Sequence, residues 1–246
     1  MTLWQGAWHI AKHEMVRDRY GLLFTLGFSI YMALITFVLI GPSKEVPFAA
    51  TWLLDSAFII TFPTLAYVMN RTMFRVWRED TYTDKLAEWR SMPIPIHALT
   101  LGRMIQLVLT LAPATLIFFI LQYVFSGYIA ANVSIAAFAL NGLFWFFYGL
   151  AFAVTYVYYE LGHSGMAFTI YSYLVLPILA VAVVIVKLVT KQSIVLEVLN
   201  GTNEGRWWYT AAALLICCAS LIAGYYAINR RLTRRSYINK SKLKGA

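Results

Sequence analysis

The sequence has few charged residues. Only 13% of its 246 residues are Asp, Glu, Lys or Arg, whereas 61% are hydrophobic. Soluble domains are about 25% charged and roughly 45–50% apolar. This shortage of charge excludes an ordinary soluble enzyme or binding domain and indicates an integral membrane protein. No segment has a soluble composition of its own, so we expect no separate soluble domain.

Residues that form disulfides and metal sites are also scarce. The two cysteines, Cys217 and Cys218, are adjacent within an apolar run, where they are poorly placed to bridge each other. Neither has metal-ligand spacing, and the chain has only four histidines. The cysteines are interpreted as buried thiols, and no metal site is predicted.

Motifs for catalysis are missing as well. The chain contains no G-x-x-x-x-G-K-[ST] phosphate loop, no G-x-S-x-G and no H-E-x-x-H. Without the phosphate loop, the chain cannot hydrolyse ATP by that chemistry. We therefore predict that the protein by itself is not an enzyme, has no catalytic residues and binds no cofactor.

What the sequence does contain is long apolar runs. A helix of about 20 apolar residues crosses the ~30 Å hydrocarbon core of a bilayer. The pattern predicts an all-α polytopic membrane protein with a six-span domain over residues 21–228. The predicted spans are 21–40, 52–69, 98 or 101 to 125, 133–158, 164–186 and 209–228.

Residues 1–20 are too polar and too short to span. On a helical wheel Trp4, Ala7, Trp8 and Ala11 share one face. This pattern favours an amphipathic helix in the membrane interface, with the tryptophans at headgroup depth. The alternative is an ordinary first helix packed on protein.

The basic residues are distributed unevenly between the two sides of these spans. Sixteen of the 20 Lys and Arg residues fall in segments 1–20, 70–103 and 229–246, all on one side. The positive-inside rule places that side in the cytoplasm. Both termini are then cytoplasmic, segment 187–208 is extracellular, and the basic tail contacts anionic membrane lipid. Nucleic acid is not an expected partner.

The charged segment 70–101 stands out between the second and third spans. A short helix is predicted over residues 82–91 and ends before Pro93, because the residue preceding a proline disfavours helical geometry. Its apolar and acidic residues allow two interpretations. It is either a solvated loop helix or a helix that docks on a cytosolic partner. The acidic ridge consists of Asp80, Asp84 and Glu88, and the mixed aromatic patch of Tyr82, Lys85, Leu86 and Trp89.

A few polar and aromatic residues in the spans are candidate functional residues. Ionisable groups inside a membrane are costly and often functional, so Asp55, Glu160 and His163 are either helix-end groups or parts of a site. Aromatic residues crowd the fourth span. They either pack internally or line a cargo path, for which the candidates are Trp145, Phe146 and Tyr148.

The layout resembles the permease subunits of type-2 ATP-binding-cassette exporters. The residues that carry the resemblance are REDTYTDKLAEWRSMPIPIHALTLGR, from 78 to 103, where that family has an acidic coupling helix and a proline-rich corner. The N-terminal helix and the long segment before the last span agree by position. A secondary carrier is less compatible, because internal repeats and a midplane ion site are not evident.

The resemblance implies a function and partners. It implies a bacterial plasma-membrane exporter for amphipathic or hydrophobic cargo, such as a peptide, toxin, antibiotic or lipid-linked compound. A separate cytosolic ATPase would bind ATP and Mg, and a second permease subunit, the same or related, would pair with this one. Trp4 and Trp8 would belong to the interfacial helix. A membrane-embedded peptide sensor or immunity protein is the alternative. The implied ATPase-coupling residues are Glu79, Asp80, Tyr82, Asp84, Lys85, Leu86, Glu88 and Trp89.

Overall fold

The computed structural model describes residues 2–40, 48–69, 80–91 and 94–235. Within these ranges the regular structure is entirely helical, so the predicted all-α class is confirmed. The helices are α1 (Leu3–Arg17), α2 (Arg19–Leu39), α3 (Phe48–Leu65), α5 (Thr81–Ser91), α6 (Ile96–Phe125), α7 (Gly127–Asn132), α8 (Ile135–Gly162), α9 (Gly165–Thr190), α10 (Ile194–Asn203) and α11 (Trp208–Arg234).

Five helices are long and apolar enough to cross a membrane: α2, α6, α8, α9 and α11. The prediction was six spans, and the second of them corresponds to α3. This helix ends at Leu65, four residues before the predicted end at Met69 and two residues after Pro63. With 18 residues, α3 is shorter than the other five, which have 21 to 30.

Serine side chains set the breaks between the later helices. Ser126, Ser134, Ser164 and Ser193 each precede a helix, and each hydroxyl accepts a hydrogen bond from a backbone N–H of its first turn. Such N-caps satisfy donors that have no partner inside the helix. The apolar runs are therefore divided into separate helices at these positions.

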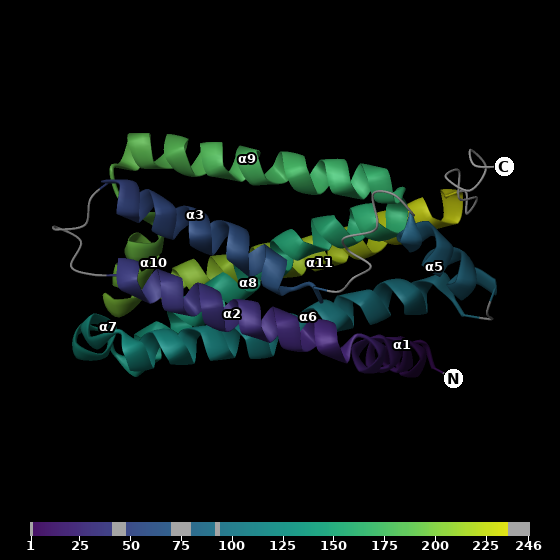
Figure 1. The fold of residues 1–246 in the computed structure, drawn as a ribbon, viewed down its shortest axis with the longest axis horizontal. Helices are drawn as coiled ribbons and strands as arrows, with labels where there is room; N and C mark the ends of the chain where they lie inside the picture. The colour runs from purple at the N-terminus through teal and green to yellow at the C-terminus, as the bar shows by residue number, and fades with distance from the viewer. Residues whose placement is uncertain (1, 41–47, 70–79, 92–93, 236–246) are drawn as a thin grey trace.

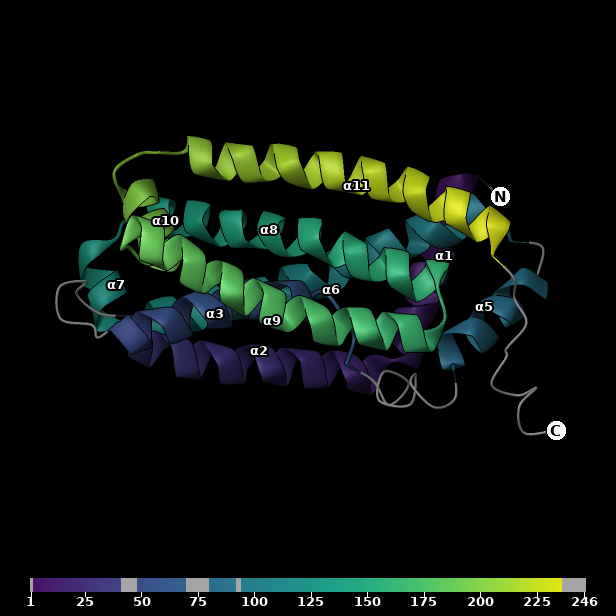
Figure 2. The ribbon, with the colours of Figure 1, turned by 90° about the horizontal axis from the view of Figure 1, so that it is seen from above.

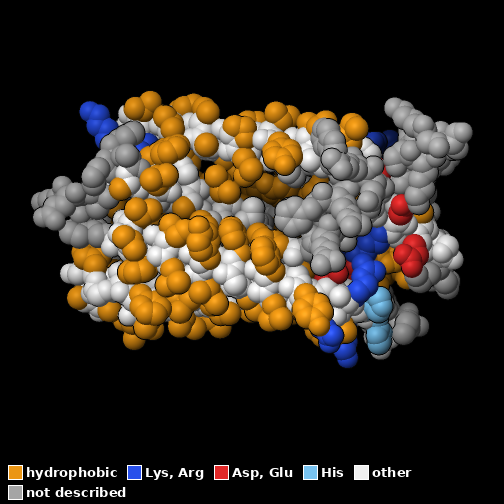
Figure 3. All heavy atoms as spheres, in the orientation of Figure 1, with side chains coloured by type: hydrophobic (Ala, Val, Ile, Leu, Met, Phe, Trp, Pro, Cys, Tyr) orange, Lys and Arg blue, Asp and Glu red, His pale blue; other side chains and the backbone are white. Residues whose placement is uncertain are grey.

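The long helices run along one axis and give the molecule two distinct ends (Figure 1). The short helices α1 and α5 and the last turn of α11 lie at one end, and α7 and α10 lie at the other, as the view from above also shows (Figure 2). The surface between the ends is mostly hydrophobic, whereas acidic, basic and histidine side chains gather around α1 and α5 (Figure 3). This distribution is that of a helical membrane protein.

Helix α2 packs on α6 through a stripe of small and polar residues. Ser29 Oγ donates to the carbonyl of Ala114 at 2.7 Å, and Gln122 Nε2 donates to Thr36 Oγ1 at 2.8 Å. Small residues allow close helix approach in membranes, and hydrogen bonds between helices add to the packing. The buried residues of α2 are Gly21, Thr25, Ser29, Ala33 and Thr36.

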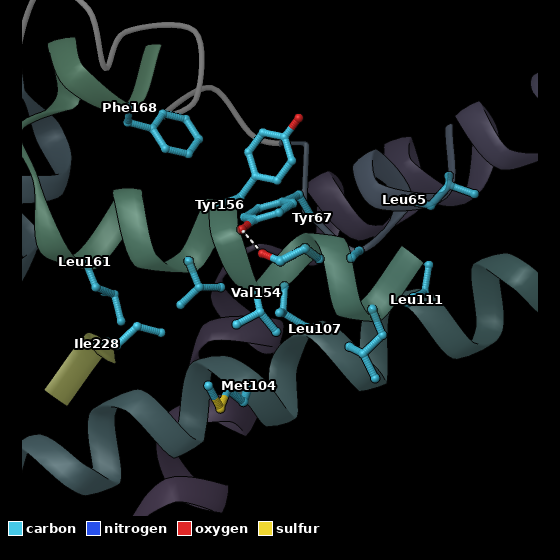
Figure 4. Close-up of a cluster of buried hydrophobic side chains, with 14 of the residues drawn as sticks. Leu65, Tyr67, Met104, Leu107, Leu111, Val154, Tyr156, Leu161, Phe168 and Ile228 are labelled. Carbon is cyan, nitrogen blue, oxygen red and sulfur yellow. Dashed lines mark hydrogen bonds between the residues drawn. The ribbon is translucent and has the colours of Figure 1, made fainter. Parts of the chain in front are cut away.

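Two hydrophobic clusters form the interior around α6 and α8. In the half that leads to α7, the rings of Phe58, Phe62, Phe118 and Trp145 pack against one another at 5.0–5.6 Å. In the other half, the Tyr67 hydroxyl donates to the carbonyl of Ala153 at 3.0 Å (Figure 4). Figure 4 shows this second cluster, which includes Tyr67, Met104, Leu107, Val154, Tyr156, Leu161, Phe168 and Ile228.

Helix α1 packs directly on α6. Ala7 and Ala11 are fully buried, and a Cβ added to Gly102 would lie only 2.9 Å from the carbonyl oxygen of Ala7. Trp4 and Trp8, at the edges of this face, remain 61% and 45% exposed. The first helix is therefore fixed to the protein by its alanines while its tryptophans point outward.

Candidate functional site

The candidate site is the charged end of the molecule, where α5 meets α1, α8 and α9. Leu86 is 1% exposed and Trp89 is 9% exposed, and both belong to the chain's own core. The Tyr82 ring packs edge-on against Phe168 with 5.3 Å between centroids. The apolar face of α5 therefore packs inward, and the structure does not present Leu86 and Trp89 as an outward docking patch.

The predicted acidic ridge is also divided. Asp80 has a left-handed backbone conformation with φ of 44° and turns toward the start of α9. Its Oδ1 accepts from the Gly165 N–H at 2.7 Å, and its Oδ2 accepts from Thr83 Oγ1 at 2.9 Å. A carboxylate at a helix N-terminus is favoured by the helix dipole. Of the ridge, Glu88 is exposed and Asp84 is half-buried, and the predicted coupling residue Glu79 lies outside the described residues.

An ion pair with a buried carboxylate joins α5 to α1. Lys85 Nζ pairs with Glu14, which also accepts from Arg17 at 3.2 Å. The ammonium lies 4.7 Å from the centroid of the Trp89 ring, a cation–π contact. Burial and the positive charge of Arg103 lower the pKa of Lys85, whereas Glu14 acts in the opposite direction. The pair fixes the position of α5 relative to the first helix.

A second ion pair joins α6 to α8. Arg103 Nη2 donates to both carboxylate oxygens of Glu160, at 2.5 and 2.6 Å, and Nη1 donates to Gln106 Oε1. Both partners are buried. Arg103 lies about 33 Å along α6 from Phe125 at 1.5 Å per residue. Since the hydrocarbon core is ~30 Å thick, the pair belongs at the edge of the membrane. We call these two ion pairs, Lys85–Glu14 and Arg103–Glu160, the ionic junction.

Tyr82 lies close to this junction. Burial and the negative charge of Glu160 raise the pKa of the Tyr82 hydroxyl. Glu160, which the sequence left as either a helix-end group or part of a site with His163, pairs with Arg103. Burial and the positive charge of Arg231 instead lower the pKa of His163.

The last turn of α11 closes the same end. Arg231 Nε donates to the carbonyl of Gly162 at 3.2 Å, and Arg235 Nη1 donates to that of Leu161 at 2.6 Å. Arg235 Nη2 also donates to Thr83 Oγ1 of α5 at 2.6 Å. Cationic groups are stabilising at a helix C-terminus. The final helix is thus joined to both α8 and α5.

At the opposite end, Asp55 is fully buried and holds α10. Its Oδ1 accepts from Ser193 Oγ at 2.6 Å and from the Val195 N–H at 3.0 Å. Lys187 is buried nearby and donates to Thr51. Asp55 therefore caps the N-terminus of the helix within the predicted extracellular segment.

The three predicted cargo-path residues occupy different surroundings. Trp145 is 1% exposed within the ring cluster, and the Tyr148 hydroxyl donates to the Ile59 carbonyl at 3.1 Å. Both therefore pack internally. Phe146 is half-buried and lines a cavity of about 680 Å³ between α6 and α8.

Sequence reasoning missed two members of the ionic junction. Arg103 sits near the start of a 30-residue apolar helix, and an ionisable residue in such a place is a recognised signal. Glu14 is the one acidic residue of α1, and its burial is not visible in the sequence pattern. Within the described part of the chain, His, Cys, Asp and Glu side chains do not form a group of three that could hold a metal.

Comparisons with known proteins leave the family open. Searches against protein-family models, curated proteins and solved structures found no match.

Proposed function

We propose that this chain is the permease subunit of an ATP-driven exporter in a bacterial plasma membrane. In this proposal α3 also crosses the membrane, as the second of six spans, α1 lies in the membrane interface, and both termini are cytoplasmic. The cargo is amphipathic or hydrophobic. A separate ATPase subunit binds ATP and Mg, and a second permease subunit completes the transporter. The proposal rests on the resemblance in residues 78–103 and on the way α5 is held.

The observation that carries the proposal is the attachment of α5. Leu86 and Trp89 anchor its inner side, Lys85 joins it to α1, and Asp80 joins it to α9. Its outer side presents Glu88. A force applied to a helix held in this way is passed to several other helices, because packed helices move as rigid elements. A merely solvated loop helix would not need these connections.

The proposal reassigns the predicted coupling residues. Glu88 and the outward part of α5 contact the ATPase, whereas Leu86, Trp89 and Lys85 transmit the movement inward. The ionic junction then continues the path, since Arg103 lies on α6 and Glu160 on α8. The extracellular helix α10, held by Asp55, covers the exit.

A photo-cross-linking amino acid at Glu88 tests this assignment. In native membranes it should capture a soluble polypeptide that carries a G-x-x-x-x-G-K-[ST] loop, identified by mass spectrometry. The matched control is the same amino acid at Ala131, which is exposed on α7 at the opposite end. Capture of such a polypeptide from both positions, or from neither, would contradict the proposal. Capture from neither, with no effect of nucleotide, would favour the peptide sensor.

A further inference from the structure

An open apolar groove runs along the surface between α6 and α8. Its volume is about 680 Å³, and its lining comes from these two helices alone. The floor is buried and includes Phe119 and Phe138, whose rings lie 5.4 Å apart. The rim is exposed, with Leu116 at 63% and Ile135 at 72%. The groove is therefore a hollow in the membrane-facing surface.

The chemistry of the lining is uniform. Its side chains are aliphatic or aromatic except for the hydroxyls of Thr115 and Tyr123, and it contains no charged residue. Thr115 is 6% exposed, and its hydroxyl is buried. A ligand with a charged or strongly polar part would leave that part unsatisfied along the groove. The lining is Ala112, Thr115, Leu116, Phe119, Ile120, Tyr123, Val124, Ile135, Phe138, Ala139, Gly142, Leu143 and Phe146.

The length of the groove matches one leaflet. On α6 it extends from Ala112 to Val124, about 18 Å at 1.5 Å per residue. One half of the hydrocarbon core is about 15 Å thick. Val124 and Ile135 lie at the helix ends next to α7, so the groove reaches from the membrane surface to mid-depth. Tyr123 lies near the surface end, where a tyrosine hydroxyl is favoured at headgroup depth.

We propose that this groove binds one acyl chain of a membrane lipid from the leaflet at the α7 and α10 end. The chain lies between the rims, in contact with Phe119 and Phe138, and its headgroup stays beyond Tyr123. A helix of a second copy fits the groove less well. Helices in membranes approach closely through small residues, whereas this rim carries Leu116, Ile120 and Ile135. The inference goes beyond the proposed transport function and does not depend on it.

The test uses the purified full-length protein in vesicles of phosphatidylcholine and phosphatidylglycerol. The probe is a phosphatidylcholine with a photoreactive diazirine in one acyl chain, and labelled residues are mapped by mass spectrometry. Ala139→Trp places an indole on the groove lining, and Ala136→Trp places one on an exposed part of the same helix outside the lining. Thermal unfolding of both variants checks that they fold.

In the wild-type protein, labels should concentrate on lining residues of α6 and α8. Ala139→Trp should reduce this labelling about tenfold, equivalent to about 1.4 kcal/mol of binding free energy, and Ala136→Trp should leave it unchanged. Unlabelled phosphatidylcholine and phosphatidylglycerol should compete equally, because the lining has no charge. Equal labelling of both variants would overturn the site. A disulfide between two copies of Ile120→Cys, with no wild-type labelling, would assign the groove to a protein contact instead.

Discussion

Removing one partner of the Arg103–Glu160 pair should destabilise the protein strongly. Glu160→Gln removes the negative charge that faces the Arg103 guanidinium. The guanidinium stays buried and keeps its hydrogen bond to Gln106. Breaking a buried ion pair in this way costs about 3–5 kcal/mol. A change of 1 kcal/mol shifts Tm by roughly 2–4 °C in proteins of 150–250 residues. The lower figure of about 3 kcal/mol therefore predicts a loss of about 6–12 °C.

The assay is thermal unfolding of the purified protein in mild detergent, and the chain offers a matched control. Glu197 pairs with Arg206 at 3.2 Å, but these side chains are 39% and 44% exposed. Exposed pairs contribute about 0–1 kcal/mol, so Glu197→Gln should lower Tm by no more than about 4 °C. The two Glu→Gln changes thus compare a buried ion pair with an exposed one.

A double variant separates the pair from the charge that is left behind. Arg103→Met combined with Glu160→Leu removes both charges, and well-packed apolar replacements of buried pairs are often neutral or stabilising. The double variant should therefore recover the Tm lost in Glu160→Gln. If Glu160→Gln and Glu197→Gln shift Tm equally, or if the double variant is as unstable as the single one, the loss of Tm does not come from an uncompensated buried charge on Arg103.

Three further predictions concern other parts of the molecule. The folded protein holds the pKa of His163 below its usual value, so the unfolded chain binds more protons than the folded one below about pH 6.5. The Tm of the wild type should therefore fall as the pH is lowered from about 7.5 to about 5.5, and the Tm of His163→Asn should fall less. Trp89→Ala should cost about 3–5 kcal/mol as a buried aromatic, whereas exposed Glu88→Ala should stay within about 0.5 kcal/mol; equal Tm values for the two would place Trp89 outside the core. Asp55→Ala removes the acceptor that holds α10 and should cost about 1–3 kcal/mol locally, seen as faster hydrogen exchange over residues 194–203; unchanged exchange there would show that α10 is held by its apolar contacts.

The membrane class and most of the spans could be predicted from the sequence. A run of about 20 apolar residues has few alternatives to a membrane helix, and α5 ends at Ser91, where the helix predicted over residues 82–91 was expected to end. The exception is α3, whose helix ends at Leu65 although apolar residues continue. Hydropathy alone does not report where such a helix stops.

The arrangement around α5 could not be predicted in the same way. A short helix with Leu86 and Trp89 on one side has an apolar face, but the pattern does not say whether that face meets the same chain or a partner. The ion pairs depend on contacts across long separations, since Arg103 and Glu160 are 57 positions apart and Lys85 and Glu14 are 71 apart. Such pairs become visible only when the helices are placed side by side.

In the proposed transporter, α5 receives its driving force from a separate ATPase. The most direct measurement is purification from native membranes in mild detergent, with mass spectrometry and an ATPase assay on the wild type and Glu88→Lys. The account predicts a stoichiometric soluble subunit with the phosphate loop, and weaker association or lower ATPase activity in Glu88→Lys, with Ala131→Lys unchanged. A protein that purifies alone, and to which added nucleotide recruits nothing, would contradict it.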